Sequence, residues 1–307
     1  MRKNLQPRVT YVIPTYNHSQ FILSAIESII DQTYQNIELL IINDGSRDNT
    51  EEIVSKISKK CENRFIRFKF ISRENKGLVK SLNEGLNWAE GEYFCMLASD
   101  DILLPAKTEI MIDLISNAHP DIVACFAAMV IIDSNSKCIG KHSPKAGIYD
   151  FSDIILKKAP YSAPTQIIRT SELRLVGGYD ENLKFEDWAI LLALTHKGKK
   201  IQVSNQVVSL YRRHPSNISK QIRENHSYRL QVLKKYADHH LYRKATARVL
   251  AGHASEIADI SSRDACITLY RAWKKNWAII FDKKFRRGTS DMTKSLIKLA
   301  ITKILQK

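Results

Sequence analysis

Cysteine is scarce in this sequence of 307 residues, and the five that occur are scattered. They form no Cys-x-x-Cys pair and their number is odd, so we expect no closed disulfide framework. Long apolar runs are also lacking, since none approaches the roughly 20 residues that a membrane-spanning helix needs. No charged-then-apolar signal pattern precedes the first predicted strand. These absences predict reduced cysteines and a cytoplasmic location.

Acidic residues are too few to balance the basic ones, and the imbalance is local. The chain carries 47 Lys or Arg against 32 Asp or Glu, a formal net charge of +15. Residues 215–307 hold 20 basic and seven acidic residues, whereas residues 1–214 hold 27 and 25. Electrostatic attraction acts through local patches, so any face that binds a polyanion is expected in the C-terminal third.

Apolar residues are plentiful, at 44% of the chain, and can bury a sizeable core. Strand-like apolar runs alternate with helical periods up to residue 98. The predicted strands are 8–14, 37–42, 67–72 and 93–98, and the predicted helices are 21–30, one that runs through Lys59 and is capped by Asp48 or Thr50, and 77–89. This alternation predicts an α/β fold with a mostly parallel sheet flanked by helices. Residues 122–132 are expected to form one or two strands and residues 140–149 a loop.

Helical periodicity dominates beyond Pro215, with short breaks expected near His253 and Gly288. We therefore expect two parts, a domain over residues 1–214 and a basic, mainly helical region over residues 215–307.

Polar clusters follow the predicted strands, where parallel sheets collect ligand groups. Pro14-Thr-Tyr-Asn17 follows the first strand and Asn43-Asp-Gly-Ser46 the second, so both loops are expected at one edge. A buried carboxylate there can accept the N–H group of a uracil-like base, and Gly45 allows the backbone to approach a ligand. The same residues are also good turn formers, so a turn with a helix cap is the alternative.

Two acidic clusters come later in the chain. Asp100 and Asp101 end the fourth predicted strand, and paired hard oxygen ligands suit Mg²⁺ or Mn²⁺, although an Asp at a helix start is an alternative. A bridging metal would stabilise the charge that builds up on a departing diphosphate. Glu186 and Asp187 precede an apolar helix. Glu186 fits a helix cap, whereas Asp187 could act as a general base toward a sugar hydroxyl.

Five motifs together resemble the family 2 glycosyltransferases of the GT-A fold. Their order and spacing match over roughly residues 9–211, and the motifs are Pro14-Thr-Tyr-Asn17, Asn43-Asp-Gly-Ser-Arg-Asp-Asn-Thr50, Asn75-Lys-Gly77, Leu97-Ala-Ser-Asp-Asp101 and Gly177-Gly-Tyr-Asp-Glu181 followed by Glu186-Asp187. Each motif is modest alone, but five in the right order are a strong signal.

The resemblance implies an inverting, metal-dependent hexosyltransferase that uses a nucleotide diphosphate sugar, such as a UDP-hexose or UDP-N-acetylhexosamine. Its acceptor would be a glycan, linked to polyprenyl diphosphate, in the assembly of O-antigen, capsule or other surface polysaccharide. By the same resemblance each site residue has an expected role: Thr15, Asn17, Lys76 and Gly77 lie near the nucleotide, Asp44 contacts the base, Asp100 and Asp101 bind ribose and the metal, and Asp187 is the catalytic base.

One departure concerns the acidic motif. Many relatives carry an Asp where this chain has Ala98, which leaves open whether Asp100 or Asp101 holds the metal. His214 resembles a histidine at the end of this domain that reaches the diphosphate or metal, and a surface histidine beside a proline turn is the alternative.

Aromatic and basic residues are interleaved in the C-terminal third, from Trp273 to Arg287. Such a surface suits an anionic membrane, which would hold the protein peripherally on the cytoplasmic face of the inner membrane. A helical appendage packed on the catalytic domain is the alternative.

Nucleic acid is not expected as a partner, because no nucleic-acid-binding signature is present. A dehydrogenase is disfavoured because residues 14–20 contain no glycine, and a non-catalytic nucleotide-sugar or glycan-binding protein on the same fold remains the second hypothesis.

Overall fold

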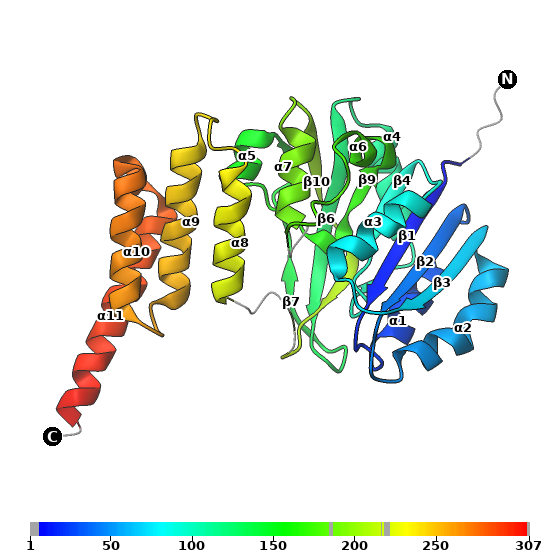
Figure 1. Ribbon diagram of the computed structural model, residues 1–307, viewed down its shortest axis with the longest axis horizontal. Coiled ribbons are helices and arrows are strands. Elements are labelled where there is room, and N and C mark those ends of the chain that lie inside the picture. Colours follow the sequence, from blue (N-terminus) through cyan, green and yellow to red (C-terminus); the bar gives the residue numbers. More distant parts are fainter. Residues whose placement is uncertain (1–5, 184–186, 216, 218–221, 306–307) are drawn as a thin grey trace. The chain divides into compact units, whose positions relative to one another are not determined.

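The structure is a computed structural model and describes residues 6–183, 187–215, 217 and 222–305 (Figure 1). These residues form two compact units. The first contains the described residues up to Ile154 together with Ala159–His214. The second contains Ile155–Lys158 and the described residues from Pro215 onward.

The chain up to Arg212 alternates strands and helices. Its strands are β1 (Val9–Thr15), β2 (Ile37–Asp44), β3 (Arg67–Arg73), β4 (Tyr93–Met96), β5 (Ile102–Leu103), β6 (Ile122–Ile132), β7 (Cys138–His142), β8 (Gly147–Tyr149), β9 (Ile167–Arg169) and β10 (Lys200–Arg212). Its helices are α1 (Ile22–Ile30), α2 (Thr50–Arg64), α3 (Leu78–Trp88), α4 (Lys107–Ser116), α5 (Phe151–Ile155), α6 (Thr170–Leu175), α7 (Asp187–Thr195) and the short 3₁₀ helix η1 (Ala163–Thr165).

The strands join in one mixed sheet with the order β3-β2-β1-β4-β9-β6-β10-β5, while β7 pairs with β6 and β8 with β10. The pairs β1/β2, β2/β3, β1/β4 and β6/β10 are parallel. The short strand β9 is antiparallel to both β4 and β6 and so joins the two parallel parts. The predicted α/β class with a mostly parallel sheet flanked by helices is confirmed.

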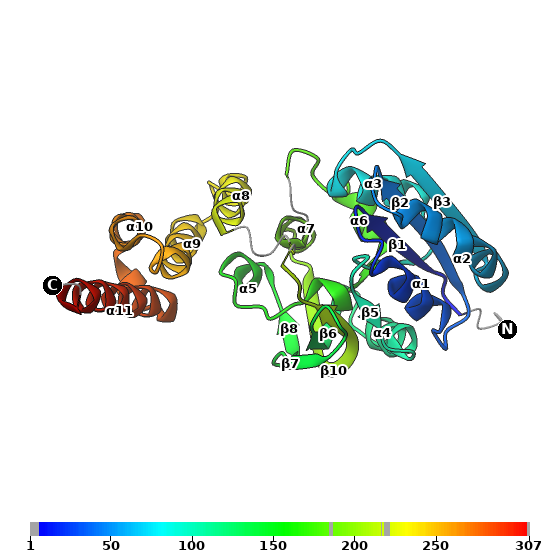
Figure 2. The same ribbon diagram turned by 90° about the horizontal axis from the view of Figure 1, so that it is seen from below.

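Every residue of strands β1 and β2 is buried, because helices cover both faces of this part of the sheet. The core on one face includes Ile26 of α1, Val54 of α2 and Met111 of α4. On the other face α3 lies close to the sheet at Gly85, where an added Cβ would lie 2.7 Å from the methyl groups of Val12. Figure 2 shows α1 and α4 on one side of β1 and α3 with α6 on the other.

One sequence expectation fails at the edge of the sheet. Residues 140–149 were expected to form a loop, but they contribute to β7 and β8. Both strands are short and mostly exposed, so the apolar alternation that marks a half-buried strand is weak in them. Their partners β6 and β10, of 11 and 13 residues, offer the backbone groups that pair with them.

The second unit is helical. Its elements are α8 (Ile222–Lys234), α9 (Tyr242–Ile257), α10 (Ser262–Lys275), the 3₁₀ helix η3 (Trp277–Phe281) and α11 (Lys283–Leu305), and α9 packs against the other three α-helices. The expected breaks near His253 and Gly288 are wrong, because α9 and α11 continue through them. At Gly288 an added Cβ would lie 3.0 Å from the carbonyl oxygen of Ala251, so this glycine serves close helix packing. Among the described helices, none combines the length and apolar content needed to cross a bilayer.

Candidate active site

The carboxyl ends of β1, β2 and β3 lie at one edge of the sheet because the strands are parallel and in register. Thr15 pairs with Asn43 across β1 and β2, and Asp44 pairs with Arg73 across β2 and β3. The hydroxyl oxygen of Thr15 is buried and has no hydrogen-bond partner among the described residues. Buried hydroxyls are normally paired, so the Thr15 hydroxyl is an exception to this rule.

The loops after β1 and β2 are linked to each other by hydrogen bonds, as their expected proximity requires. The Asn17 backbone N–H donates to Ser46 Oγ at 2.9 Å, and the Arg47 backbone N–H donates to Asn17 Oδ1 at 2.8 Å. Asn17 has a φ of 53°, a conformation that Asn tolerates better than most residues. Asn17 therefore fixes the loop geometry with both its backbone and its side chain.

Asp44 organises the neighbouring loop that contains Lys76 and Gly77. Its carboxylate accepts the backbone N–H groups of both residues at 2.8 Å and forms a close ion pair with Arg73. Gly45 has a φ of +77°, and an added Cβ there would lie 2.7 Å from the backbone nitrogen of Asn75. The structure thus brings Asp44, Lys76 and Gly77 together, with the carboxylate already accepting three donors.

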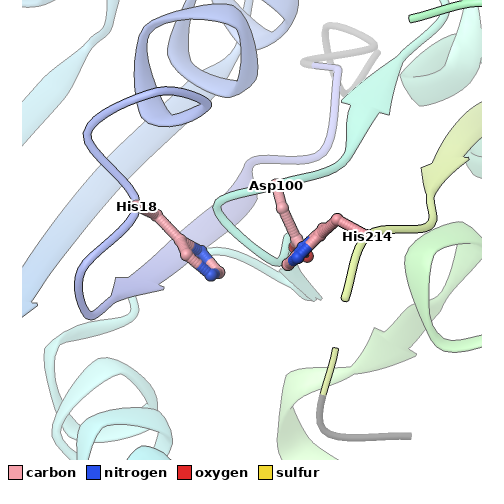
Figure 3. A group of neighbouring side chains, drawn as sticks. All are labelled: His18, Asp100 and His214. Atoms are coloured by element: carbon pink, nitrogen blue, oxygen red, sulfur yellow. The ribbon is translucent and has the colours of Figure 1, made fainter. Parts of the chain in front are cut away.

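Three potential metal ligands meet beside these loops (Figure 3). His18 follows β1, Asp100 follows β4 and His214 follows β10, and one ligand atom from each lies within 4.8 Å of the other two. His214 Nε2 lies 2.8 Å from Asp100 Oδ2. His18 Nδ1 lies 2.7 Å from Ser99 Oγ. Burial lowers the pKa of His18 below its ordinary value, so the imidazole is neutral near pH 7.

Asp101 faces different partners from those of Asp100. It is buried, and its Oδ1 accepts the backbone N–H of Arg212 at 2.9 Å. The Arg212 side chain in turn donates from Nε to the carbonyl oxygen of Asp100 at 2.9 Å. Burial, and then the neighbouring Asp100 charge, raise the pKa of Asp101 well above its ordinary value. Within the described part of the chain, the group of residues that could hold a metal contains His18, Asp100 and His214 and leaves Asp101 out.

Asp187 is the first residue of α7 and its side chain is exposed. Its Oδ1 accepts the backbone N–H of Trp188 at 2.5 Å. The buried Trp188 ring fixes α7, because its Nε1 donates to the carbonyl oxygen of Ile154 at 2.9 Å. Asp187 lines a small pocket together with Phe126, Tyr161, Ala163, Gln166, Tyr179, Ile190 and Leu191. Glu186, the expected helix cap, lies outside the described residues.

Sequence reasoning missed His18 and Arg73. His18 directly follows the Pro14–Asn17 motif, so a search for histidines beside the strand-end loops would have found it. Arg73 gave no such signal, because its partner Asp44 is 29 positions away and only the β2/β3 register brings them together.

Known proteins resemble this chain in sequence. The family model described as "Glycosyl transferase family 2" matches residues 10–167. An uncharacterized glycosyltransferase of Haemophilus influenzae is 31% identical over 249 residues, which cover 74% of this chain and 76% of that protein. A second one, from Rickettsia typhi, is 31% identical over 191 residues, or 60% of this chain. That match spans 58% of the length of the Rickettsia protein.

Two solved structures share the fold. Staphylococcus aureus TarS in complex with UDP-GlcNAc has a TM-score of 0.66 at 18% identity, covering 86% of this chain and 79% of that one. A mannosyltransferase from Pyrobaculum calidifontis in complex with GDP-Man and Mn²⁺ has a TM-score of 0.58 at 16% identity, covering 99% and 89%. At these identities the similarity establishes the GT-A fold.

Proposed function

This chain belongs to glycosyltransferase family 2, and from that premise we propose that it is an inverting, metal-dependent hexosyltransferase. It would move a sugar from a nucleotide diphosphate donor to a hydroxyl group of a glycan. One observation carries the proposal: His18, Asp100 and His214 form a group of potential metal ligands at the sheet edge that also holds the Thr15–Asn17 and Asp44–Gly77 loops. A family 2 fold without a donor site would not need this arrangement.

The donor is proposed to be a UDP-hexose or UDP-N-acetylhexosamine. TarS was solved in complex with UDP-GlcNAc and the mannosyltransferase in complex with GDP-Man, so proteins of this fold bind more than one nucleotide sugar. In this chain, the unpaired Thr15 hydroxyl can donate to or accept from the nucleotide. Asp44 would act on the nucleotide chiefly through the Lys76–Gly77 loop that it shapes, with its remaining lone pair free to meet the base.

The cluster fits a divalent metal through the chemistry of its donors. Asp100 supplies a carboxylate, and His18 and His214 supply imidazoles. Imidazole donors suit transition metals, whereas Mg²⁺ prefers oxygen, so of Mn²⁺ and Mg²⁺ we propose Mn²⁺ as the more tightly bound ion. A metal bound there would neutralise the charge on the diphosphate leaving group.

Asp187 is proposed as the general base. Its exposed carboxylate faces the pocket at the start of α7, and its hydrogen bond from the Trp188 N–H fixes the direction of one oxygen. The other oxygen can then take the proton of the acceptor hydroxyl while that hydroxyl oxygen attacks the anomeric carbon. The bond between the anomeric carbon and the diphosphate oxygen would break on the opposite face, so that the nucleotide diphosphate leaves and the anomeric configuration is inverted.

The acceptor is proposed to be a glycan linked to polyprenyl diphosphate, in O-antigen, capsule or other surface-polysaccharide assembly. Such an acceptor resides in the inner leaflet of a membrane, so the enzyme would act while bound peripherally at the cytoplasmic face. The surplus of basic residues in 215–307 supports this, because anionic lipids attract basic segments.

A donor screen tests the proposal. The full chain is incubated with a panel of nucleotide sugars, and release of nucleotide diphosphate is measured with Mn²⁺, with Mg²⁺ and with a chelator. We expect one donor to be hydrolysed, fastest with Mn²⁺ and not with the chelator. Binding of a donor without turnover under all conditions would favour a non-catalytic nucleotide-sugar-binding protein.

Replacing His18 with Ala is expected to weaken Mn²⁺ binding by at least about tenfold, the range seen even when groups outside the ligand set are lost. The variant removes one of three donors and leaves Asp100 and His214 in place. Electron paramagnetic resonance titration of free Mn²⁺, without nucleotide, measures the affinity. His119→Ala is the matched control, since that imidazole is 72% exposed and lies outside the cluster. Equal Mn²⁺ affinity in both variants would remove His18 from the ligand set.

A further inference from the structure

The 3₁₀ helix η3 of the second unit exposes two large aromatic side chains. Trp277 is 67% exposed and Phe281 is 71% exposed, and Ile280 between them is 40% exposed. Exposing aromatic surface in water is unfavourable, and apolar side chains gathered on one short segment indicate an interaction surface. We call Trp277, Ile280 and Phe281 the η3 wedge.

The wedge is held rigidly by its own segment. Ile279 is 3% exposed and packs in a core with Ala247, Leu250, Ala251 and Ala272. Asn276 begins η3 by accepting the backbone N–H of Ala278 on its Oδ1 at 3.1 Å. At the other end, Asp282 forms a close ion pair with Arg248. These contacts hold Trp277 and Phe281 outward, so their exposure does not arise from a loose chain end.

Basic side chains surround the wedge. Residues 270–294 contain eight Lys or Arg and two Asp, and both Asp residues are engaged by other groups. Asp282 pairs with Arg248, and Asp291 accepts a hydrogen bond from Ser255 and lies 3.6 Å from Arg287. The exposed cations next to η3 are Lys274, Lys275, Lys283, Arg286 and Arg287. The surface around the wedge is therefore strongly positive.

A groove continues from the wedge along α11. Ile280 and Phe285 form its apolar part, and the remaining lining residues are Arg286, Thr289, Ser290, Thr293 and Lys294. Two cations together with hydroxyl groups match a phosphate group, while the apolar part matches a hydrocarbon chain. The ligand that fits both halves is an anionic phospholipid.

We propose that the η3 wedge and the basic groove beside it form the membrane-docking surface of this protein, and that they bind anionic phospholipid bilayers. Trp277 and Phe281 insert at the level of the headgroups, and the surrounding Lys and Arg side chains neutralise lipid phosphates. This location rests on the proposed function only in that a lipid-linked acceptor requires the enzyme to reach a membrane. Aromatic side chains at the interface and basic groups near anionic lipid are the two contributions that such binding combines.

The test is co-sedimentation of the full chain with vesicles of phosphatidylcholine alone and of phosphatidylcholine containing phosphatidylglycerol. We expect binding to the anionic vesicles, and a loss of roughly tenfold or more in the Trp277→Ser/Phe281→Ser double variant, because burial of each side chain is favourable. The Trp277→Phe/Phe281→Trp double variant keeps the aromatic surface and should bind as the wild type does. Ile260→Ser is the matched control, since Ile260 is 65% exposed in the same unit but outside the wedge.

Tryptophan fluorescence adds a measurement that would not change if Trp277 and Phe281 only stabilised the fold. Vesicles should shift the tryptophan emission to the blue, and the Trp277→Phe variant should lose most of that shift while still binding. The proposal is overturned if the Ser double variant binds as the wild type does, or if Ile260→Ser is equally impaired. It is also overturned if the wild type binds a double-stranded oligonucleotide and no vesicle.

Donor hydrolysis in solution separates the two proposals. The Ser double variant should release nucleotide diphosphate from a soluble nucleotide sugar at the wild-type rate, because the wedge lies outside the catalytic residues. Vesicle binding without any donor turnover would contradict the proposed function and leave the docking surface intact. Turnover without vesicle binding would contradict the docking surface and leave the proposed function intact.

Discussion

Replacing Asp187 with Asn is expected to lower turnover by about three orders of magnitude, within the range that general-base catalysis contributes. The amide keeps the size of the carboxylate, and its oxygen can still accept the Trp188 N–H, so α7 should begin as it does now. The amide cannot take a proton from the acceptor hydroxyl. Because the change affects only the transition state, affinity for the nucleotide should stay nearly unchanged.

Turnover and nucleotide affinity are measured on the same protein, by diphosphate release and by calorimetry. Asp150→Asn is the matched control, since Asp150 also stands at a helix start and accepts the Asp153 N–H at 3.1 Å. Asp150 lies outside the pocket lined by Asp187, so its variant should turn over normally. An Asp187→Asn variant that keeps most of its activity would contradict the assignment of Asp187 as the general base.

Replacing Asp100 with Asn is expected to weaken Mn²⁺ binding by about a hundredfold or more and to abolish metal-stimulated turnover. Asp100 supplies the only carboxylate among the three potential ligands, and without it two imidazoles remain to hold a dication. Mn²⁺ titration by electron paramagnetic resonance measures the loss, and turnover is followed at rising Mn²⁺ concentration.

The Asp101→Asn variant tests which carboxylate of Asp100 and Asp101 binds the metal. Its side-chain oxygen can still accept the Arg212 N–H, so the link between β10 and the Ser99–Asp101 turn is preserved. We expect near wild-type Mn²⁺ affinity for this variant and for Asp113→Asn, which removes an exposed carboxylate of α4. The reverse pattern, with affinity lost in Asp101→Asn and kept in Asp100→Asn, would contradict the assignment.

Much of the fold could be predicted because periodicity is a local property of the chain. The buried strands β1 and β2 are nearly continuous apolar runs, and α1 carries apolar residues at helical spacing, so each element could be recognised separately. Strands β7 and β8 could not, because pairing with the long neighbours β6 and β10 brings them into the sheet and their own residues carry little pattern. The expected break at Gly288 failed for a similar reason, since packing against α9 explains this glycine.

By itself the sequence determined the α/β class, the five motifs and the edge of the sheet at which Thr15, Asp44 and Asp100 lie. It could do so because the carboxyl ends of parallel strands must meet at one edge. Only the tertiary structure decided what each side chain meets there: that His18 joins Asp100 and His214, that Asp101 turns toward the Arg212 backbone, and that Asp44 holds the Lys76–Gly77 loop.

In residues 215–307, too, the sequence decided one part and the tertiary structure the other. Interleaved aromatic and basic residues were visible in the sequence, but it did not show that Ile279 is 3% exposed while Trp277 and Phe281 on either side are 67% and 71% exposed. Contacts, burial and exposure depend on which segments distant in sequence pack together. Local pattern therefore fixes the elements and their order, whereas packing fixes which side chains remain for chemistry and binding.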